Sequence, residues 1–208
     1  YRFTSDLTKV GEEWRFTHLK GRFGDSDLAG RFTVSQPGGR TLIKGDLATQ
    51  KLDIIDVGPF IGYDPEKLAS QGAGGAIETV SGTPRVLPDT PLRVEAIRNF
   101  DADVRYSVKT VRAPNVPISN AAVTVKLDKS LLTLSPLTFD MAGGHVASDI
   151  RINARQRPAH TNYDIRLAPT PMGTLLARWG VAESGTNGTV KGRVQKTGIG
   201  DSLHDSLG

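Results

Sequence analysis

The chain has 208 residues, 38% of them hydrophobic but only 6% aromatic, and it contains no cysteine. The lack of cysteine excludes a disulfide framework, a cysteine-ligated zinc site and thiol catalysis. The net charge of +4 comes from lysines and arginines spread along the chain, without the basic stripe and interleaved aromatics that are typical of nucleic-acid binders. We therefore expect no nucleic-acid partner.

The ends of the sequence suggest a piece of a longer protein. The chain begins at Tyr1 without a signal peptide, and it ends in GDSLHDSLG, where a helix is starting. No stretch approaches the roughly 20 apolar residues of a membrane span.

Residues 1–62 show the two-residue alternation of β-strands. Trp14 and Phe16 fall on one side of their segment, and Leu28, Phe32 and Val34 fall on one side of the next. DVGPFIG at 56–62 then has apolar residues at helical spacing, with Asp56 as a candidate cap. We expect antiparallel strands followed by a short helix.

Residues 63–90 are rich in Gly, Ser and Pro, and their hydrophobic residues show no sustained periodic spacing. The glycine cluster at 72–75 lacks the preceding strand and the Lys-Ser/Thr pair of a phosphate-binding loop. The segment is expected to be a flexible linker.

Residues 91–208 contain a dense series of strands. The clearest is 101–109, where Ala102, Val104, Tyr106 and Val108 alternate with charged or polar residues. Further strands are predicted up to 167, followed by a helix at 170–180 with Thr170 as its cap and Pro171 in its first turn. A last strand and the helix start near 201 complete this part, which we expect to continue the same sheet.

The predicted fold is mainly β, with two or three short helices. So few helices cannot cover this many half-apolar strands. Either two sheets close face to face, or one long sheet bends over a cavity. Alternation alone favours the closed sandwich, because its two apolar faces cover each other.

No residue pattern indicates catalysis or a bound metal. The four histidines are scattered, and no nucleophile motif of the GxSxG type occurs. Asp101 and Asp103 share one side of a strand, but Arg105 lies beside them, and a solvated ion cluster explains all three. We expect neither an enzyme nor a cofactor.

Three segments resemble the AsmA family of bacterial envelope proteins, in its AsmA-like C-terminal region. The first is WRFTHLKGRFGDSDLAGRFTV at 14–34, with its glycines and Ser-Asp-Leu. The second, 86–154, begins VLPDTPL and includes the Asp-Ala-Asp strand and the Gly143–Gly144 hairpin. The third is GIGDSLHDSLG at 198–208. Their order along most of the chain makes the resemblance specific.

The resemblance implies a fold and a setting. The fold is a long curved antiparallel sheet, shaped like a taco, with an aliphatic groove. The setting is the periplasm, with the parent protein anchored in the inner membrane by a helix outside this sequence. The implied function is phospholipid transport between membranes and outer-membrane homeostasis. The alternative is a non-catalytic scaffold or assembly factor for outer-membrane proteins.

The implied partners are phospholipid acyl chains, the rest of the parent chain and envelope proteins. No catalytic residue follows from the resemblance. The apolar side chains expected to line the lipid groove are Trp14, Phe16, Phe32, Val104, Tyr106, Val108, Val123, Val125, Leu127, Leu137, Phe139, Met141, Val146, Ile150, Ile152, Ile165 and Leu167.

Overall fold

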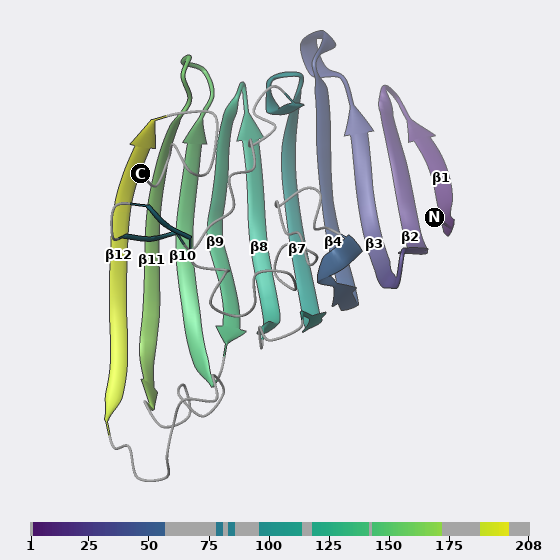
Figure 1. The fold of residues 1–208 in the computed structure, drawn as a ribbon. Helices are drawn as coiled ribbons and strands as arrows, with labels where there is room; N and C mark the ends of the chain where they lie inside the picture. The colour runs from purple at the N-terminus through teal and green to yellow at the C-terminus, as the bar shows by residue number, and fades with distance from the viewer. Residues whose placement is uncertain are drawn as a thin grey trace.

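The structure, a computed structural model, describes residues 2–56, 78–80, 83–85, 96–113, 118–141, 143–171 and 188–199. Ten strands form one open sheet in which successive strands of the chain are neighbours (Figure 1). They are β1 (Arg2–Val10), β2 (Glu13–Phe23), β3 (Ser26–Ser35), β4 (Thr41–Asp53), β7 (Phe100–Arg112), β8 (Ile118–Asp128), β9 (Leu131–Met141), β10 (Gly144–Asn153), β11 (His160–Pro171) and β12 (Thr189–Ile199). The edge strands are β1 and β12.

The predicted antiparallel sheet is confirmed except at one pair of strands. All neighbours are antiparallel apart from β4 and β7, which run parallel from Thr41 opposite Phe100 to Asp53 opposite Arg112. The parallel pair arises because the connection between β4 and β7 returns the chain to the end of the sheet at which β4 began. Within that connection, β5 (Glu78–Val80) and β6 (Thr83–Arg85) form a separate two-stranded sheet.

The predicted helices are not confirmed. Those at 56–62, 170–180 and 201–208 lie almost entirely outside the described residues. In the part that is described, residues 54–56 are helical, and two 3-10 turns occupy Pro37–Gly39 and Ala96–Arg98. The predicted linker at 63–90 also falls outside the described residues apart from β5 and β6, so the domain boundaries stay a prediction.

The expected helix start at Thr170 and Pro171 is wrong. Both residues belong to the end of β11, where they pair with Val190 and Thr189 of β12. The Thr170 hydroxyl donates to the carbonyl of Ala168 in its own strand, at 2.8 Å. A Thr-Pro pair is compatible both with the start of a helix and with the end of a strand. Here the pairing with β12 places it at the end of a strand.

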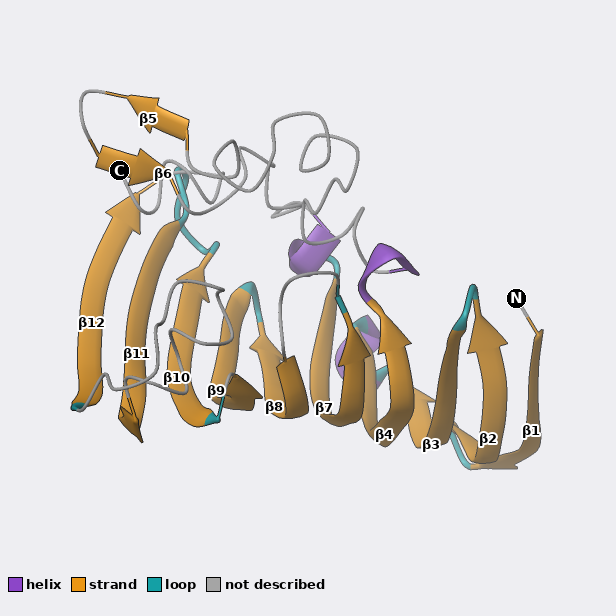
Figure 2. Cartoon of the chain, turned by 60° about the horizontal axis from the view of Figure 1, so that its bottom comes forward, coloured by secondary structure: helices purple, strands orange, loops and turns teal. Residues whose placement is uncertain are grey.

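The sheet is curved, because its strands bend along their length (Figure 2). Register shifts accompany the bending at several strand pairs, for example between Phe16 and Leu19 of β2 and between Ser148 and Ile150 of β10. Such bulges increase local twist and bend a strand. Among the described residues, no helix has the length and hydrophobicity needed to cross a bilayer.

The Ser-Asp-Leu segment of β3 fixes the end of β4. The Asp27 carboxylate accepts hydrogen bonds from the backbone N–H groups of Gln50 and Lys51, at 2.9 and 2.8 Å. The Ser26 hydroxyl accepts from the Asp53 N–H at 2.8 Å and donates to the Asp56 carboxylate at 2.6 Å. The motif thus satisfies backbone donors of β4 beyond Ala48, where the pairing with β3 has ended.

These bonds also correct the expected role of Asp56. Its carboxylate binds the Ser26 hydroxyl and the Asp25 N–H, and so it ties the β2–β3 turn to the end of β4. The capping role at the helical residues 54–56 belongs to Asp53, whose carboxylate accepts from the Ile55 N–H at 3.2 Å. Sequence spacing alone does not distinguish two aspartates three residues apart.

Candidate functional site: an apolar sheet face

One face of the ten-stranded sheet is apolar from edge to edge. Residues directly opposite each other in neighbouring strands point to the same face. Following these partners from strand to strand gives three apolar rows, defined by their members in chain order. The first is Leu7, Phe16, Phe32, Gly45, Val104, Val125, Leu134, Ile150, Tyr163 and Lys196.

The second apolar row also crosses all ten strands: Lys9, Trp14, Val34, Ile43, Ala102, Leu127, Leu132, Ile152, Thr161 and Gly198. The third starts at β2: Leu19, Gly30, Leu47, Tyr106, Val123, Leu137, Ser148, Ile165 and Val194. The charged members of the three rows are Lys9 and Lys196, which stand in the two edge strands.

The opposite face is polar. One of its rows crosses the ten strands as Thr8, Arg15, Thr33, Lys44, Asp103, Lys126, Thr133, Arg151, Asn162 and Thr197. This contrast between faces is what a sheet with one dry and one wet side requires. What covers the apolar face is therefore the functional question.

In the part of the chain that the structure describes, no second sheet packs face to face on the ten-stranded one. Only nine described hydrophobic residues are buried, and two of these are the small Ala154 and Ala159. A closed sandwich would bury the alternate residues of every strand. Large apolar side chains are instead exposed near both edges, including Leu7 at 54% and Val194 at 56%.

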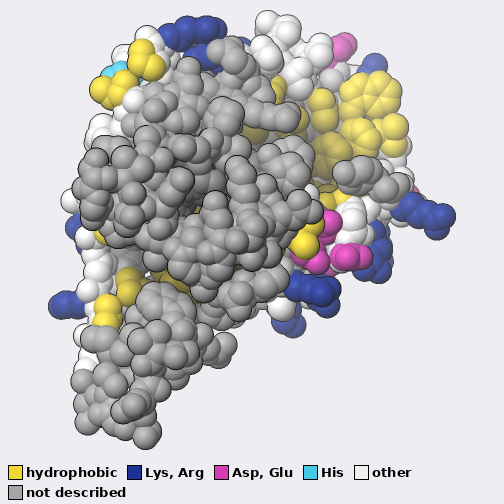
Figure 3. Space-filling model, viewed as in Figure 1, with side chains coloured by type: hydrophobic (Ala, Val, Ile, Leu, Met, Phe, Trp, Pro, Cys, Tyr) yellow, Lys and Arg dark blue, Asp and Glu magenta, His cyan; other side chains and the backbone are white. Residues whose placement is uncertain are grey.

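Four aromatic side chains of the apolar face, those of Phe3, Trp14, Phe16 and Phe32, gather at the β1–β3 end. Phe16 and Phe32 stack with ring centroids 4.5 Å apart and 10° between their planes. Trp14 is 43% exposed and Phe3 is 46% exposed. Figure 3 shows hydrophobic side chains gathered over this end of the sheet. The rest of the face, from β7 to β10, is largely aliphatic.

A pair of hydroxyl groups lies within the apolar face. Thr49 is buried, and its Oγ1 lies 2.6 Å from the phenol oxygen of Tyr106 in the parallel neighbour strand. Burial raises the pKa of the Tyr106 phenol, and the bond to Thr49 only partly opposes that effect. Each hydroxyl thus satisfies the other in surroundings that offer few polar partners.

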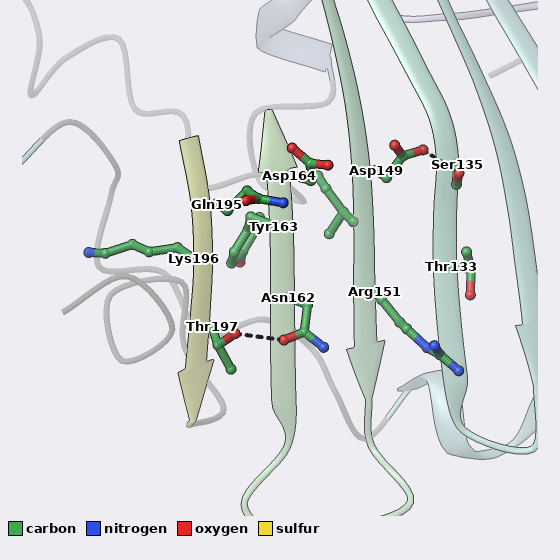
Figure 4. Close-up of a pocket in the computed structure, with 11 residues that line it drawn as sticks. Thr133, Ser135, Asp149, Arg151, Asn162, Tyr163, Asp164, Gln195, Lys196 and Thr197 are labelled. Atoms are coloured by element: carbon green, nitrogen blue, oxygen red, sulfur yellow. Dashed lines mark hydrogen bonds between the residues drawn. The ribbon is translucent and has the colours of Figure 1, made fainter. Parts of the chain in front are cut away.

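The polar face carries an ion network at β9–β12, of which Figure 4 shows Ser135, Asp149 and Asp164. Arg166 bridges Asp149 at 2.7 Å and Asp164 at 2.8 Å, and Arg193 binds both carboxylate oxygens of Asp164 at 3.0 and 2.9 Å. The Ser135 hydroxyl also donates to Asp149. The bond from Ser135, followed by that from Arg166, lowers the pKa of Asp149, and the bonds from Arg193 and Arg166 lower the pKa of Asp164.

A cavity of about 420 Å³ lies beside this network, and a second of about 330 Å³ lies near Arg105. Polar-face side chains form most of both linings. The carboxylates beside the larger cavity already bind arginines. We assign the functional site to the extended apolar face, because its pattern spans every strand whereas the cavities are local hollows.

In the expected ion cluster of Asp101, Asp103 and Arg105, Asp101 binds residues outside the cluster. Asp101 binds Arg40 of the β4 entrance at 2.8 Å and accepts the Lys129 N–H of the β8–β9 turn at 2.9 Å. Burial would raise the pKa of Asp101, but the bonds from Arg40 and Lys129 outweigh it and lower that pKa. Among the residues described, no group of three or more metal-ligating side chains gathers.

The structure places all seventeen residues of the expected groove lining on the apolar face. Twelve of them lie in the three rows, and Val108, Phe139, Met141, Val146 and Leu167 follow at alternate positions of the same strands. Whether they bind lipid stays a prediction. The sequence prediction omitted Ile43, Leu47, Leu132 and Leu134, although their two-residue spacing is a signal that identifies them.

The described strands thus define a class of protein, in which they form a single-layer β-sheet with one continuous apolar face. The family model of the AsmA family matches residues 3–207, and the chain belongs to that family. The AsmA family protein YhjG of Escherichia coli (strain K12) is 27% identical over 206 residues. That alignment covers 97% of this chain and 30% of YhjG, so the chain spans about a third of this relative. No solved structure gives a significant match.

Proposed function

We propose that the apolar face is a groove for lipid acyl chains, and that the domain takes part in phospholipid transport between membranes and in outer-membrane homeostasis. The observation that carries the proposal is the set of three apolar rows, uncharged between the edge strands, on a face without a second sheet among the described residues. Aliphatic chains match such a surface, because they need no polar partners.

The dimensions of the face suit this ligand. Ten strands at a spacing of ~4.8 Å span roughly 43 Å across the sheet. One leaflet contributes about half of the ~30 Å hydrocarbon thickness of a bilayer. An acyl chain therefore fits within the face, and neighbouring chains fit side by side. Acyl chains would shield apolar side chains that are now exposed, such as Leu7 and Val194.

The setting is also part of the proposal. The domain would work in the periplasm, in a parent protein held in the inner membrane, with phospholipid and the rest of that protein as partners. It would act without a catalytic step or a cofactor. Family membership supports this setting, and the proposal extends to this chain what the family resemblance implies.

A substitution pair tests the proposal. Val125 lies in the first apolar row, and its neighbour Thr124 points to the polar face, opposite Arg105. An Asp at position 125 of a water-accessible groove stays hydrated, whereas in a closed core it would cost several kcal/mol. We expect Val125→Asp to fold with a modest loss of stability and to lose co-purified lipid, while Thr124→Asp keeps both.

The measurements are thermal melting by circular dichroism, native mass spectrometry and lipid extraction for the wild type and both variants. A wild type that carries no lipid, together with a Val125→Asp variant that does not fold, would contradict the groove. That outcome would favour a scaffold for envelope proteins. The exposed edge strand β1, in which every residue is solvent-exposed, is the feature that such a role would use.

A further inference from the structure

Within the three apolar rows, charged side chains are confined to the two edge strands. In the three rows, Lys9 of β1 and Lys196 of β12 are the charged residues, and the positions between them are apolar, glycine or hydroxyl-bearing. A lysine on an edge strand often serves to discourage strand pairing. The surroundings of Lys9 indicate an additional role.

Lys9 lies beside the exposed aromatic end of the sheet. Its ammonium stands 5.1 Å from the centroid of the Trp14 ring, which lies opposite it in β2. The Phe16–Phe32 stack lies in the adjacent row, next to Leu7. Trp14 and Leu7 are 43% and 54% exposed, so the cation and the aromatic surface are both accessible from the apolar side.

The carboxylates near Lys9 in sequence are those of Asp6, Glu12 and Glu13, and among the described residues none of them forms an ion pair with Lys9. Glu13 binds Arg15 at 2.7 Å, and Asp6 binds the His18 ring at 2.8 Å. Among the described residues, Lys9 forms no ion pair; its described contact is the Trp14 ring. A cation–π contact leaves the ammonium able to bind an anion on its other side.

We propose that Lys9, Trp14 and the Phe16–Phe32 stack bind an amphiphile with an anionic headgroup. Lys9 binds the negative group, and the aliphatic chain lies over the aromatic rings. The inference rests on the proposed function, and it adds a headgroup preference and a position for the headgroup at the β1 edge. Lys9 is the charged group at the β1 end of the three apolar rows, and its charge selects an anionic over an uncharged amphiphile.

Two ligands of the same chain length test this preference: dodecyl phosphate and dodecanol, each used below the concentration at which it aggregates. Binding is followed by the change in tryptophan fluorescence as each ligand is added. The chain has two tryptophans, Trp14 and Trp179, so the titrations use a Trp179→Phe background in which the signal comes from Trp14. Isothermal titration calorimetry of the otherwise unaltered chain provides a readout that does not depend on this background. The variants are Lys9→Gln, Lys9→Arg and, as a matched control on the polar face, Lys44→Gln.

We expect Lys9→Gln to weaken dodecyl phosphate binding roughly three- to fivefold, the effect of one exposed ion pair. Dodecanol binding should not change, Lys9→Arg should retain phosphate binding, and Lys44→Gln should bind both ligands as the wild type does. Equal phosphate affinity in the wild type and Lys9→Gln, or an equal loss in Lys44→Gln, would overturn the headgroup site but leave the groove intact. A wild type that binds neither ligand would overturn both.

Discussion

Phe32 of β3 lies directly opposite Gly45 of β4, and a Cβ atom placed on Gly45 would come within 2.7 Å of the Phe32 Cβ and 2.5 Å of the Arg31 carbonyl oxygen. Glycine therefore allows the two strands to approach each other beside the ring that stacks on Phe16. The aromatic end of the apolar face depends on this close approach, because Phe16, Phe32 and Gly45 occupy successive positions of one row.

The first prediction follows from that contact. Gly45→Ala should destabilise the domain by about 1–3 kcal/mol, because the backbone of β3 must move to admit the methyl group. Gly192 of β12 is the matched control, since a Cβ there would meet no atom within 4 Å. Gly192→Ala should change stability by less than about 0.5 kcal/mol. Urea unfolding followed by circular dichroism measures both; equal effects would show that the contact at Gly45 is unimportant.

A second prediction concerns Asp27, whose carboxylate accepts the N–H groups of Gln50 and Lys51. Asp27→Ala leaves both donors to water at the end of β4, beyond its pairing with β3. The expected loss is on the order of 1 kcal/mol, because solvent reaches the site and replaces part of the bonding. Asp25, in the adjacent turn, uses only its backbone in the described hydrogen bonds, and Asp25→Ala serves as the control.

The amount of structure that the sequence reveals differs between features. Alternation in single strands, as at Val104, Tyr106 and Val108, is enough to predict the strands and the side chains that share a face. It does not reveal which strands are neighbours, and so the parallel pairing of β4 with β7 was not predicted. That pairing depends on the path of a long connection, about which local periodicity carries no information.

The candidate site also combines features that the sequence predicts with features that it does not. Each groove residue is predicted from the alternation in its own strand, and the pairing of the strands then aligns these residues in rows. The ion partners were not identified, because Arg40 and Asp101 lie 61 residues apart in the sequence and meet only through the β4–β7 pairing. Predicting contacts of this kind requires the order of the strands in the sheet. Predicting the face on which a residue lies requires only its odd or even position within the strand.

A third prediction concerns acid stability. Hydrogen bonds from Ser135 and Arg166 lower the pKa of Asp149, and those from Arg193 and Arg166 lower the pKa of Asp164. A carboxyl group whose pKa is lower in the folded state stabilises the fold above its unfolded pKa of about 3.9, and this contribution is lost as the pH falls through the folded pKa. The melting temperature should therefore be nearly constant from about pH 7 to 5 and fall below about pH 4.

The Asp164→Asn variant tests whether this network is responsible. It should melt at a lower temperature than the wild type near pH 7 and lose less on acidification, since one of the linked carboxylates is gone. Asp25→Asn, which changes a carboxylate outside the network, should follow the wild-type profile. The hypothesis fails if Asp164→Asn keeps the full acid sensitivity of the wild type.

The last prediction concerns the hydroxyl pair of Thr49 and Tyr106 inside the apolar face. Thr49 is 1% exposed, and its described side-chain hydrogen bond is the one at 2.6 Å to the Tyr106 phenol. Tyr106→Phe leaves the Thr49 hydroxyl buried without that partner, which should cost about 1–3 kcal/mol. Replacing both hydroxyls, as in Thr49→Val with Tyr106→Phe, should restore most of the loss, because groups of similar shape then pack without a polar atom to satisfy.

Urea unfolding of the two single variants and the double variant gives the coupling energy. A double variant whose loss equals the sum of the two single losses would show that the hydroxyls do not depend on each other, and that water satisfies Thr49 from the open side of the sheet.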